Sequence, residues 1–227
     1  KNGLPFYDLF APVGKASKAY TIEEAREVLL REMGKFTPDM AQFMDNAFEQ
    51  RWIDVYPKEG KGGGAFCAGA HEYDRSLILT NFQGSFSEIS TLAHELGHAW
   101  HNECIKDHRA LNHDYSMPLA ETASTFNECV VMASAIGKAA DDQEKLALIE
   151  SQLQDATQII CDIYSRFRFE KAVFEKRPEE FMHADTLCGL MTDAQKASYG
   201  DGLDPQTLHP YMWVCKSHYY GPTYYNF

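Results

Sequence analysis

Residues 94–98 read His-Glu-Leu-Gly-His, and this motif constrains the chain more than any other stretch. The surrounding segment, Ser87 to Lys106, carries no proline, and its apolar residues recur at helical spacing, which predicts a helix. At about 3.6 residues per turn, His94 and His98 then lie roughly 40° apart on one face of that helix. Two imidazoles in this arrangement can bind one Zn²⁺ ion.

Glu95 follows the first histidine and points to the flank of the helix. From there it can reach a water on the metal but hardly the metal itself. The alternative is a helix that carries two histidines by chance, because a bare motif of this length also occurs by accident. The surroundings of the motif therefore have to decide between a metal site and an ordinary helix.

The composition limits the class of protein. The 227 residues suffice for one or two domains with a sizeable core, and the 44% hydrophobic content indicates a globular protein. The formal net charge is -12 without a basic block, which argues against a nucleic acid or an anionic membrane as partner. The sequence contains no apolar run of about 18 residues, so no transmembrane helix is predicted, and no signal peptide is recognisable.

The six cysteines are widely spread without a CxxC pair. We therefore expect reduced thiols in a cytoplasmic protein rather than disulfides or a structural zinc site. Lys1 is not a start methionine, and Phe227 closes a dense aromatic stretch. These two ends predict a fragment or a processed chain.

The other helices are expected to begin at capping or proline signals. Thr21-Ile22-Glu23-Glu24 is a capping box, with the second glutamate three residues after the cap. The remaining expected helices start at Pro38, run from Pro118 to about Ile136, run from Asp141 to Glu175, and start at Pro178.

Two short strands are expected before the motif, at Ala65 to Ala70 and Ser76 to Phe82. The preceding stretch, Lys58 to Gly64, is glycine-rich but lacks the pattern of a phosphate loop, so a mobile loop is predicted there. The strand at Ala65 to Ala70 is a plausible edge to which a substrate backbone could add as a further strand.

A catalytic zinc takes three protein ligands and keeps a fourth position for water. A third histidine six residues after His98, as in metzincins, is excluded because Cys104 occupies that position and His101 replaces the required glycine. Glu103 is expected to face away from the metal, and Asp114 lies in an irregular segment that is a poor base for precise geometry.

A glutamate from the helix that starts at Pro118 is the other option. Glu121 and Glu128 lie seven residues apart and hence on one face of that helix. An unpaired carboxylate facing a core is costly, so a metal or a histidine partner is expected. A solvated glutamate face is the alternative.

The stretch HELGHAWH at 94–101, followed by AETASTFNE at 120–128, resembles the thimet oligopeptidase/oligoendopeptidase F family of zinc metallopeptidases. YDLFAPVG at 7–14 and GGGAFCAG at 62–69 are similar to the oligoendopeptidase F branch. The resemblance implies a mainly α, zincin-like helical catalytic domain with a small β-sheet before the motif helix. Family members are much longer, so residues 1–227 resemble the catalytic C-terminal half, without the N-terminal half or the extreme C-terminus.

Carried over residue by residue, the resemblance implies that His94, His98 and Glu121 are the zinc ligands. It implies that Glu95 is the general base. Glu128 matches a carboxylate that orients a ligand histidine.

The closing aromatic segment resembles the part of the family that stabilises the oxyanion. His218 and a tyrosine close behind it match the hydrogen-bond donors. Tyr224 is favoured, with Tyr225 and Tyr220 as rivals, because the spacing from His218 differs between branches of the family. Plain aromatic core is the alternative for each tyrosine.

The implied function is zinc-dependent endopeptidase hydrolysis of short unstructured peptides, with Glu95 as general base. A different zinc hydrolase with the same ligands, such as a carboxypeptidase, and a non-catalytic zinc-binding or scaffold domain are the alternatives. Glu95 argues against a scaffold, because a structural zinc is usually closed by four protein ligands. Besides peptide substrates, the missing N-terminal half or a second copy is the expected partner.

The remaining histidines are not expected to bind the metal. His101 shares a face with His94 and His98, and its expected role is packing or support behind the ligands. Surface or loop positions without a partner are expected for His71, His108, His113, His183 and His209.

Overall fold

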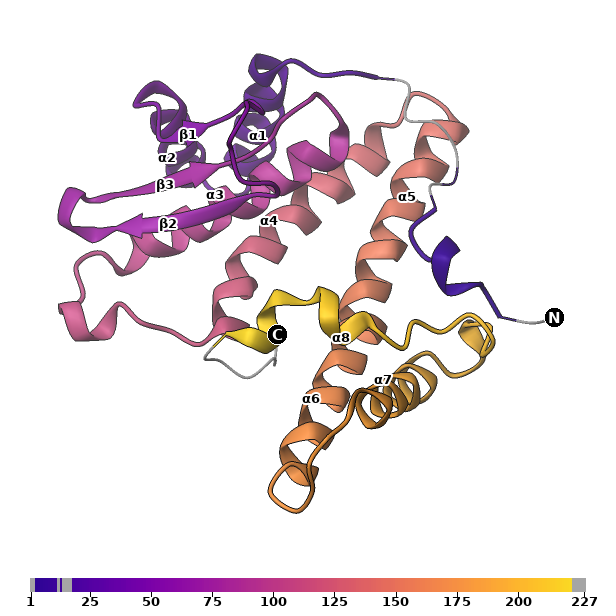
Figure 1. Ribbon diagram of the computed structural model, residues 1–227. Helices are drawn as coiled ribbons and strands as arrows, with labels where there is room; N and C mark the ends of the chain where they lie inside the picture. The colour runs from indigo at the N-terminus through magenta and orange to yellow at the C-terminus, as the bar shows by residue number, and fades with distance from the viewer. Residues whose placement is uncertain (1–2, 12, 14–17, 222–227) are drawn as a thin grey trace. The chain divides into compact units, whose positions relative to one another are not determined.

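The computed structural model describes residues 3–11, 13 and 18–221, without the side chains of 217 and 218, and it is mainly helical, as the sequence predicts (Figure 1). The chain forms two compact units, which we call the motif unit (Gly14–Ile149) and the C-terminal unit (Lys1–Val13 with Glu150–Phe227). In the described part of the chain, no helix is both long and apolar enough to cross a membrane.

In its described part, the motif unit combines four α-helices with a small sheet, and a fifth α-helix begins in it. Its α-helices and strands are α1 (Ile22–Phe36), α2 (Pro38–Glu49), β1 (Ile53–Asp54), β2 (Phe66–Ala70), β3 (Arg75–Leu79), α3 (Phe86–Ile105), α4 (Met117–Lys138) and the first part of α5 (Asp142–Thr157).

Two of these helices begin with capping boxes. The Thr21 hydroxyl accepts a hydrogen bond from the Glu24 amide, and the Glu24 carboxylate accepts one from the Thr21 amide, which confirms the prediction for α1. Ser85 and Glu88 exchange the same pair of bonds at the start of α3. Each box satisfies backbone donors that the first helical turn leaves free.

The core of the motif unit lies between the apolar faces of α1, α2 and α3. Ala25, Leu29 and Met33 of α1 are fully buried, as their helical spacing predicts. The buried apolar residues of α3 are Ile89, Leu92, Ala93, Leu96 and Ala99. This face of α3 points into the core, so the remaining faces of the helix can carry polar groups.

The sheet has the order β1-β3-β2, with β1 parallel and β2 antiparallel to β3. The prediction of β2 is confirmed to within one residue, whereas β3 ends at Leu79 rather than Phe82. The strand β1 was not predicted, because two residues are too few to show an alternating pattern. Among the described strands, β2 pairs only with β3, so its other edge is open.

Glu32 is a buried carboxylate that joins α1 to α4. Its side chain is 3% exposed and forms ion pairs with Arg31, Lys35 and Lys138. Burial alone would raise its pKa, but the hydrogen bonds from the neighbouring Lys138 and Lys35 outweigh this and hold the pKa well below its usual range. The ionised carboxylate therefore stabilises the fold.

Glu32→Gln is expected to lower the free energy of unfolding at pH 7 by about 1.5–3 kcal/mol, the range for hydrogen bonds to charged groups. A depressed carboxyl pKa stabilises the fold above the pKa of the unfolded chain, near 4.3, and this contribution is lost as the pH falls. Urea unfolding at pH 7 and pH 3 should therefore show a large difference between parent and variant at pH 7 and a smaller one at pH 3.

The described part of the C-terminal unit consists of helices joined by turns and irregular segments, with one isolated parallel β-bridge between Leu4 and Leu203. Its elements are η1 (Phe6–Asp8), the rest of α5, η4 (Gln158–Ile163), α6 (Tyr164–Lys176), α7 (Ala184–Tyr199), η5 (Gly200–Gly202), α8 (Met212–Cys215) and η6 (Ser217–Tyr220). The predicted helical stretch from Asp141 to Glu175 is confirmed, with a π-helical segment, η4, in its middle.

The prediction of a helix at Pro178 is wrong. The amides of Arg177 and Glu180 still donate to carbonyl oxygens of α6, so Pro178 lies in turns that extend the end of that helix. The next helix begins at Ala184, after His183 as its N-cap residue. Proline favours the second position of a turn as well as the first turn of a helix, and the sequence alone does not separate the two.

Candidate metal centre

Helix α3 places His94 and His98 on one face, because they are four residues apart in a regular helix. Leu92, Ala93 and Leu96 hold the opposite side of α3 in the core. The two imidazole rings are 4.7 Å apart between centroids, and their Nε2 atoms are 3.1 Å apart. The face that points out of the core thus presents two nitrogen atoms to one place.

Helix α4 crosses α3 closely, because Gly97 leaves no side chain between the two helices. A Cβ atom at this position would lie 2.7 Å from the Ala123 carbonyl oxygen and 2.8 Å from the Ser124 Cα. The buried Asn127 amide reaches across from α4 and donates to the Ala93 carbonyl oxygen at 3.2 Å. The glycine of the motif is therefore what allows α4 to bring its glutamates to the histidines.

Gly97→Ala is expected to push α4 away from α3 and to destabilise the motif unit by about 1–3 kcal/mol, as overpacking does. Gly137→Ala, on α4, is the matched control, because nothing lies within 4 Å of the added methyl group. Urea unfolding should show the loss only for Gly97→Ala. A Gly97→Ala protein as stable as the control would contradict the close crossing.

The structure brings His94, His98 and Glu121 together in one group. One ligand atom from each lies within 4.8 Å of the others. The Glu121 Oε2 atom is 3.3 Å from His94 Nε2 and 3.8 Å from His98 Nε2. The Ser124 hydroxyl donates to the same oxygen at 2.9 Å, which holds the carboxylate in this orientation.

Glu128 lies on the other side of the His94 ring. Its Oε1 atom is 2.5 Å from His94 Nδ1. A carboxylate accepts, so Nδ1 carries a proton, and Nε2 faces His98 and Glu121. The two glutamates that share a face of α4 thus have different positions, one beside each nitrogen of the same imidazole.

The charges of this group favour a bound cation. Burial lowers the pKa of His94, but hydrogen bonds to Glu121 and Glu128 outweigh it and raise that pKa to about 10. The pKa of His98 is lowered, mainly by burial and by the neighbouring His94. A proton or a metal ion is needed to offset the carboxylates, and a divalent cation between Nε2 of both histidines and Glu121 does so directly.

Glu95 is buried beside this group, with 5% of its surface exposed. Burial raises its pKa to about 7, and the nearby Glu121 and Glu128 add to this against the opposing effect of His94. A divalent cation at the neighbouring group would favour the ionised form. The described geometry does not include Glu95 among the three residues that could hold the ion.

The predicted oxyanion donors are only partly described. Tyr224 and Tyr225 lie outside the described residues, as does the side chain of His218. Tyr220 is 66% exposed, and its hydroxyl donates to the Trp213 carbonyl oxygen at 3.4 Å. Tyr219, by contrast, is partly buried and packs against the core of the C-terminal unit.

His101 does not join the metal group. Its ring stacks on Tyr115 at 4.2 Å, and its buried Nδ1 atom has no hydrogen-bond partner among the described residues. The Tyr115 hydroxyl donates to Asn102 at 2.9 Å, and Asn102 donates to Ser76 at 3.1 Å. These contacts hold the segment before α4 against α3.

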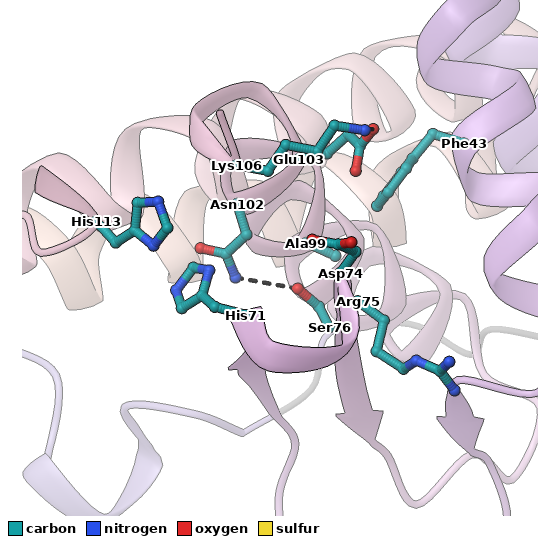
Figure 2. A pocket seen from close by; sticks show the side chains of 10 residues that line it. All are labelled: Phe43, His71, Asp74, Arg75, Ser76, Ala99, Asn102, Glu103, Lys106 and His113. Carbon is teal, nitrogen blue, oxygen red and sulfur yellow. Dashed lines mark hydrogen bonds and ion pairs between the residues drawn. The ribbon is translucent and has the colours of Figure 1, made fainter. Parts of the chain in front are cut away.

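Sequence reasoning missed the pocket beside the metal group. Its lining residues include His98 and Glu121 of the metal group, and also Cys67, His71 and Tyr115. A neighbouring pocket shares His71, which the sequence placed in a loop without a partner (Figure 2). His71 comes from the turn between β2 and β3 and Tyr115 from the irregular segment before α4, where no periodic pattern indicates that they meet.

Comparisons with known proteins give the family. The sequence profile of Peptidase family M3 matches residues 6–227. Oligopeptidase PepF of Bacillus subtilis is 28% identical over 94% of this chain and 32% of its own length. The chromosomal oligoendopeptidase F of Lactococcus lactis subsp. cremoris is 26% identical over 100% of this chain and 37% of its own length.

Solved structures share the fold. A putative peptidase from Chlamydophila abortus superposes with a TM-score of 0.77 at 24% identity, over 98% of this chain and 38% of that one. A structure described as a putative oligoendopeptidase F superposes with a TM-score of 0.72 at 23% identity, over 94% of this chain and 37% of that one. The chain thus spans about a third of the length of its relatives, and it belongs to Peptidase family M3.

Proposed function

We propose that this chain is the catalytic part, residues 1–227, of a zinc-dependent endopeptidase that hydrolyses short unstructured peptides. The observation that carries the proposal is the group formed by His94, His98 and Glu121, with ligand atoms within 4.8 Å of one another. Membership of a peptidase family and the names of the relatives support peptide bonds as the target.

The donor set suits zinc. Two imidazole nitrogens and one carboxylate oxygen are typical ligands of a catalytic zinc, which takes three from the protein. Glu128 orients His94 for this role, because its Oε1 atom lies 2.5 Å from Nδ1 and accepts the proton there, which leaves Nε2 as the atom that would bind the ion. A three-ligand site with a carboxylate beside it favours catalysis over a structural role, for which four protein ligands are usual.

When bound, a zinc ion supplies Lewis-acid polarisation at this place. Glu95 then acts as general base: its carboxylate takes a proton from the attacking water and returns it to the leaving amine. Its buried position strengthens this role, since a carboxylate with few waters around it exchanges protons with the reacting groups rather than with solvent.

His218 and a tyrosine behind it, with Tyr224 favoured, are proposed as donors to the oxyanion of the tetrahedral intermediate. Resemblance to the family supports these two roles. The open edge of β2 supports binding of the substrate as an added strand, because its backbone groups on that side have no partner among the described strands.

A partner that covers apolar surface is part of the proposal, and a segment like the N-terminal part of the longer relatives or a second copy of this chain fits this role. Leu146, Leu153 and Ile160 recur at seven-residue spacing and are 54%, 62% and 69% exposed. A stripe of this kind is typical of a surface that another segment covers. Reduced thiols support a cytoplasmic location, and each described cysteine is free.

Hydrolysis of a quenched fluorescent peptide tests the proposal. The isolated chain is expected to show weak activity that a chelator abolishes and added zinc restores, with metal content measured alongside. Activity that persists in a chelator after the metal is removed would contradict the zinc mechanism. A monomeric chain with full activity would contradict the need for a partner.

A further inference from the structure

His71 and His113 line the same pocket as His98 and Glu121. They come from different segments, since His71 opens the turn between β2 and β3 and His113 follows the short helix η3 (Ala110–Asn112). Figure 2 shows the two imidazoles side by side, with Asn102 next to them. Their ring centroids are 4.2 Å apart and their planes are inclined by 36°.

The hydrogen bond of His113 leaves one of its nitrogens free to bind an ion. Nε2 lies 2.9 Å from the carbonyl oxygen of His108. A carbonyl oxygen only accepts, so Nε2 carries the proton and Nδ1 of the neutral ring keeps its lone pair. Metal-binding histidines in proteins are commonly held in this way, with one nitrogen donating to a carbonyl and the other on the ion.

The charged residues around the pair favour a cation over an anion. The two pockets that the histidines share are lined by four carboxylates, of Asp74, Glu103, Asp114 and Glu121, and by two basic side chains, of Arg75 and Lys106. Lys106 is neutralised by Glu103 at 2.5 Å. Arg75 extends away from the histidines in Figure 2. A substrate carboxylate would therefore meet an excess of negative charge here.

We propose that His71 and His113 bind a second divalent transition-metal ion, for which zinc is the test ion. Imidazole suits ions of this class, and water completes the coordination. Among the described residues, only the group of His94, His98 and Glu121 supplies three ligands to one place. The site at His71 and His113 supplies two, so it is expected to bind the ion more weakly. The ion would occupy the pocket that adjoins His98 and Glu121, so an excess of zinc is expected to inhibit hydrolysis.

Calorimetric titration of zinc into the metal-free chain tests this second site. The parent chain is expected to bind two equivalents, the second more weakly. His71→Ala and His113→Ala should each lose the second equivalent and keep the first, which also shows that the variants are folded. His108→Ala is the matched control, because it removes an exposed imidazole from the same segment and retains the carbonyl group; it should bind two equivalents.

The proposed second site and the proposed peptidase mechanism can be refuted independently of each other. Glu121→Ala should lose the tight equivalent and keep the weaker one, whose ligands it does not touch. Uptake of a single equivalent by the parent chain would overturn the proposal of a second site and leave the proposed peptidase mechanism standing. The second site is also refuted if His71→Ala and His113→Ala both bind two equivalents with unchanged affinities.

Discussion

Glu95→Gln is expected to lower peptide turnover by about 10²–10⁴-fold, the usual contribution of a general base. Glutamine has the same shape but cannot take a proton from the attacking water. Zinc binding should stay close to that of the parent, because Glu95 is not one of the three residues whose ligand atoms converge. Steady-state hydrolysis of a fluorescent peptide and zinc content, measured on the same preparation, give both quantities.

The matched control for this variant is Glu27→Gln, which makes the same chemical change at an exposed position of α1. Its turnover and zinc content should equal those of the parent. Near-normal turnover in Glu95→Gln would remove the general-base assignment. Loss of zinc from Glu95→Gln would instead place its carboxylate on the metal.

Glu121→Ala is expected to abolish stable zinc binding at the first site. The side chain supplies the only carboxylate oxygen in the described three-residue group, and its removal leaves two imidazoles. Glu128→Ala should weaken zinc affinity by about 10–100-fold, the usual effect of losing a group that orients a ligand. The difference follows from geometry, because Glu121 faces Nε2 of His94 while Glu128 faces Nδ1.

Zinc titration of both variants separates the two roles. Glu128→Gln should recover part of the affinity, because its amide oxygen can still accept the proton of Nδ1. The assignment is reversed if Glu128→Ala loses the metal and Glu121→Ala keeps it.

Local signals in the sequence predicted most of the helices. The capping box at Thr21 and the helix around His94 depend on neighbouring residues alone, and the structure has both. The helical stretch from Asp141 was also predicted, because its apolar residues from Leu146 to Ile163 keep helical spacing. Pro178 misled because a proline marks a turn as readily as a helix start.

In the candidate site, too, local spacing was predictable from the sequence and contacts between distant segments were not. The spacing of His94 and His98 predicts their shared face, and family resemblance singled out Glu121 and Glu128 on the next helix. How closely the two helices cross could not be predicted, because Gly97 acts through backbone atoms of α4 that lie far from it in sequence. His71 remained hidden for a related reason, since contacts between irregular segments leave no periodic pattern.

The most direct test of the proposed mechanism is the position of one equivalent of zinc, located by anomalous diffraction from crystals of the metal-loaded chain. We expect a single strong peak about 2.0–2.2 Å from Nε2 of His94, Nε2 of His98 and an oxygen of Glu121. A peak bonded to Glu128 or Glu95 in place of Glu121, or a peak away from both histidines of the motif, would contradict it.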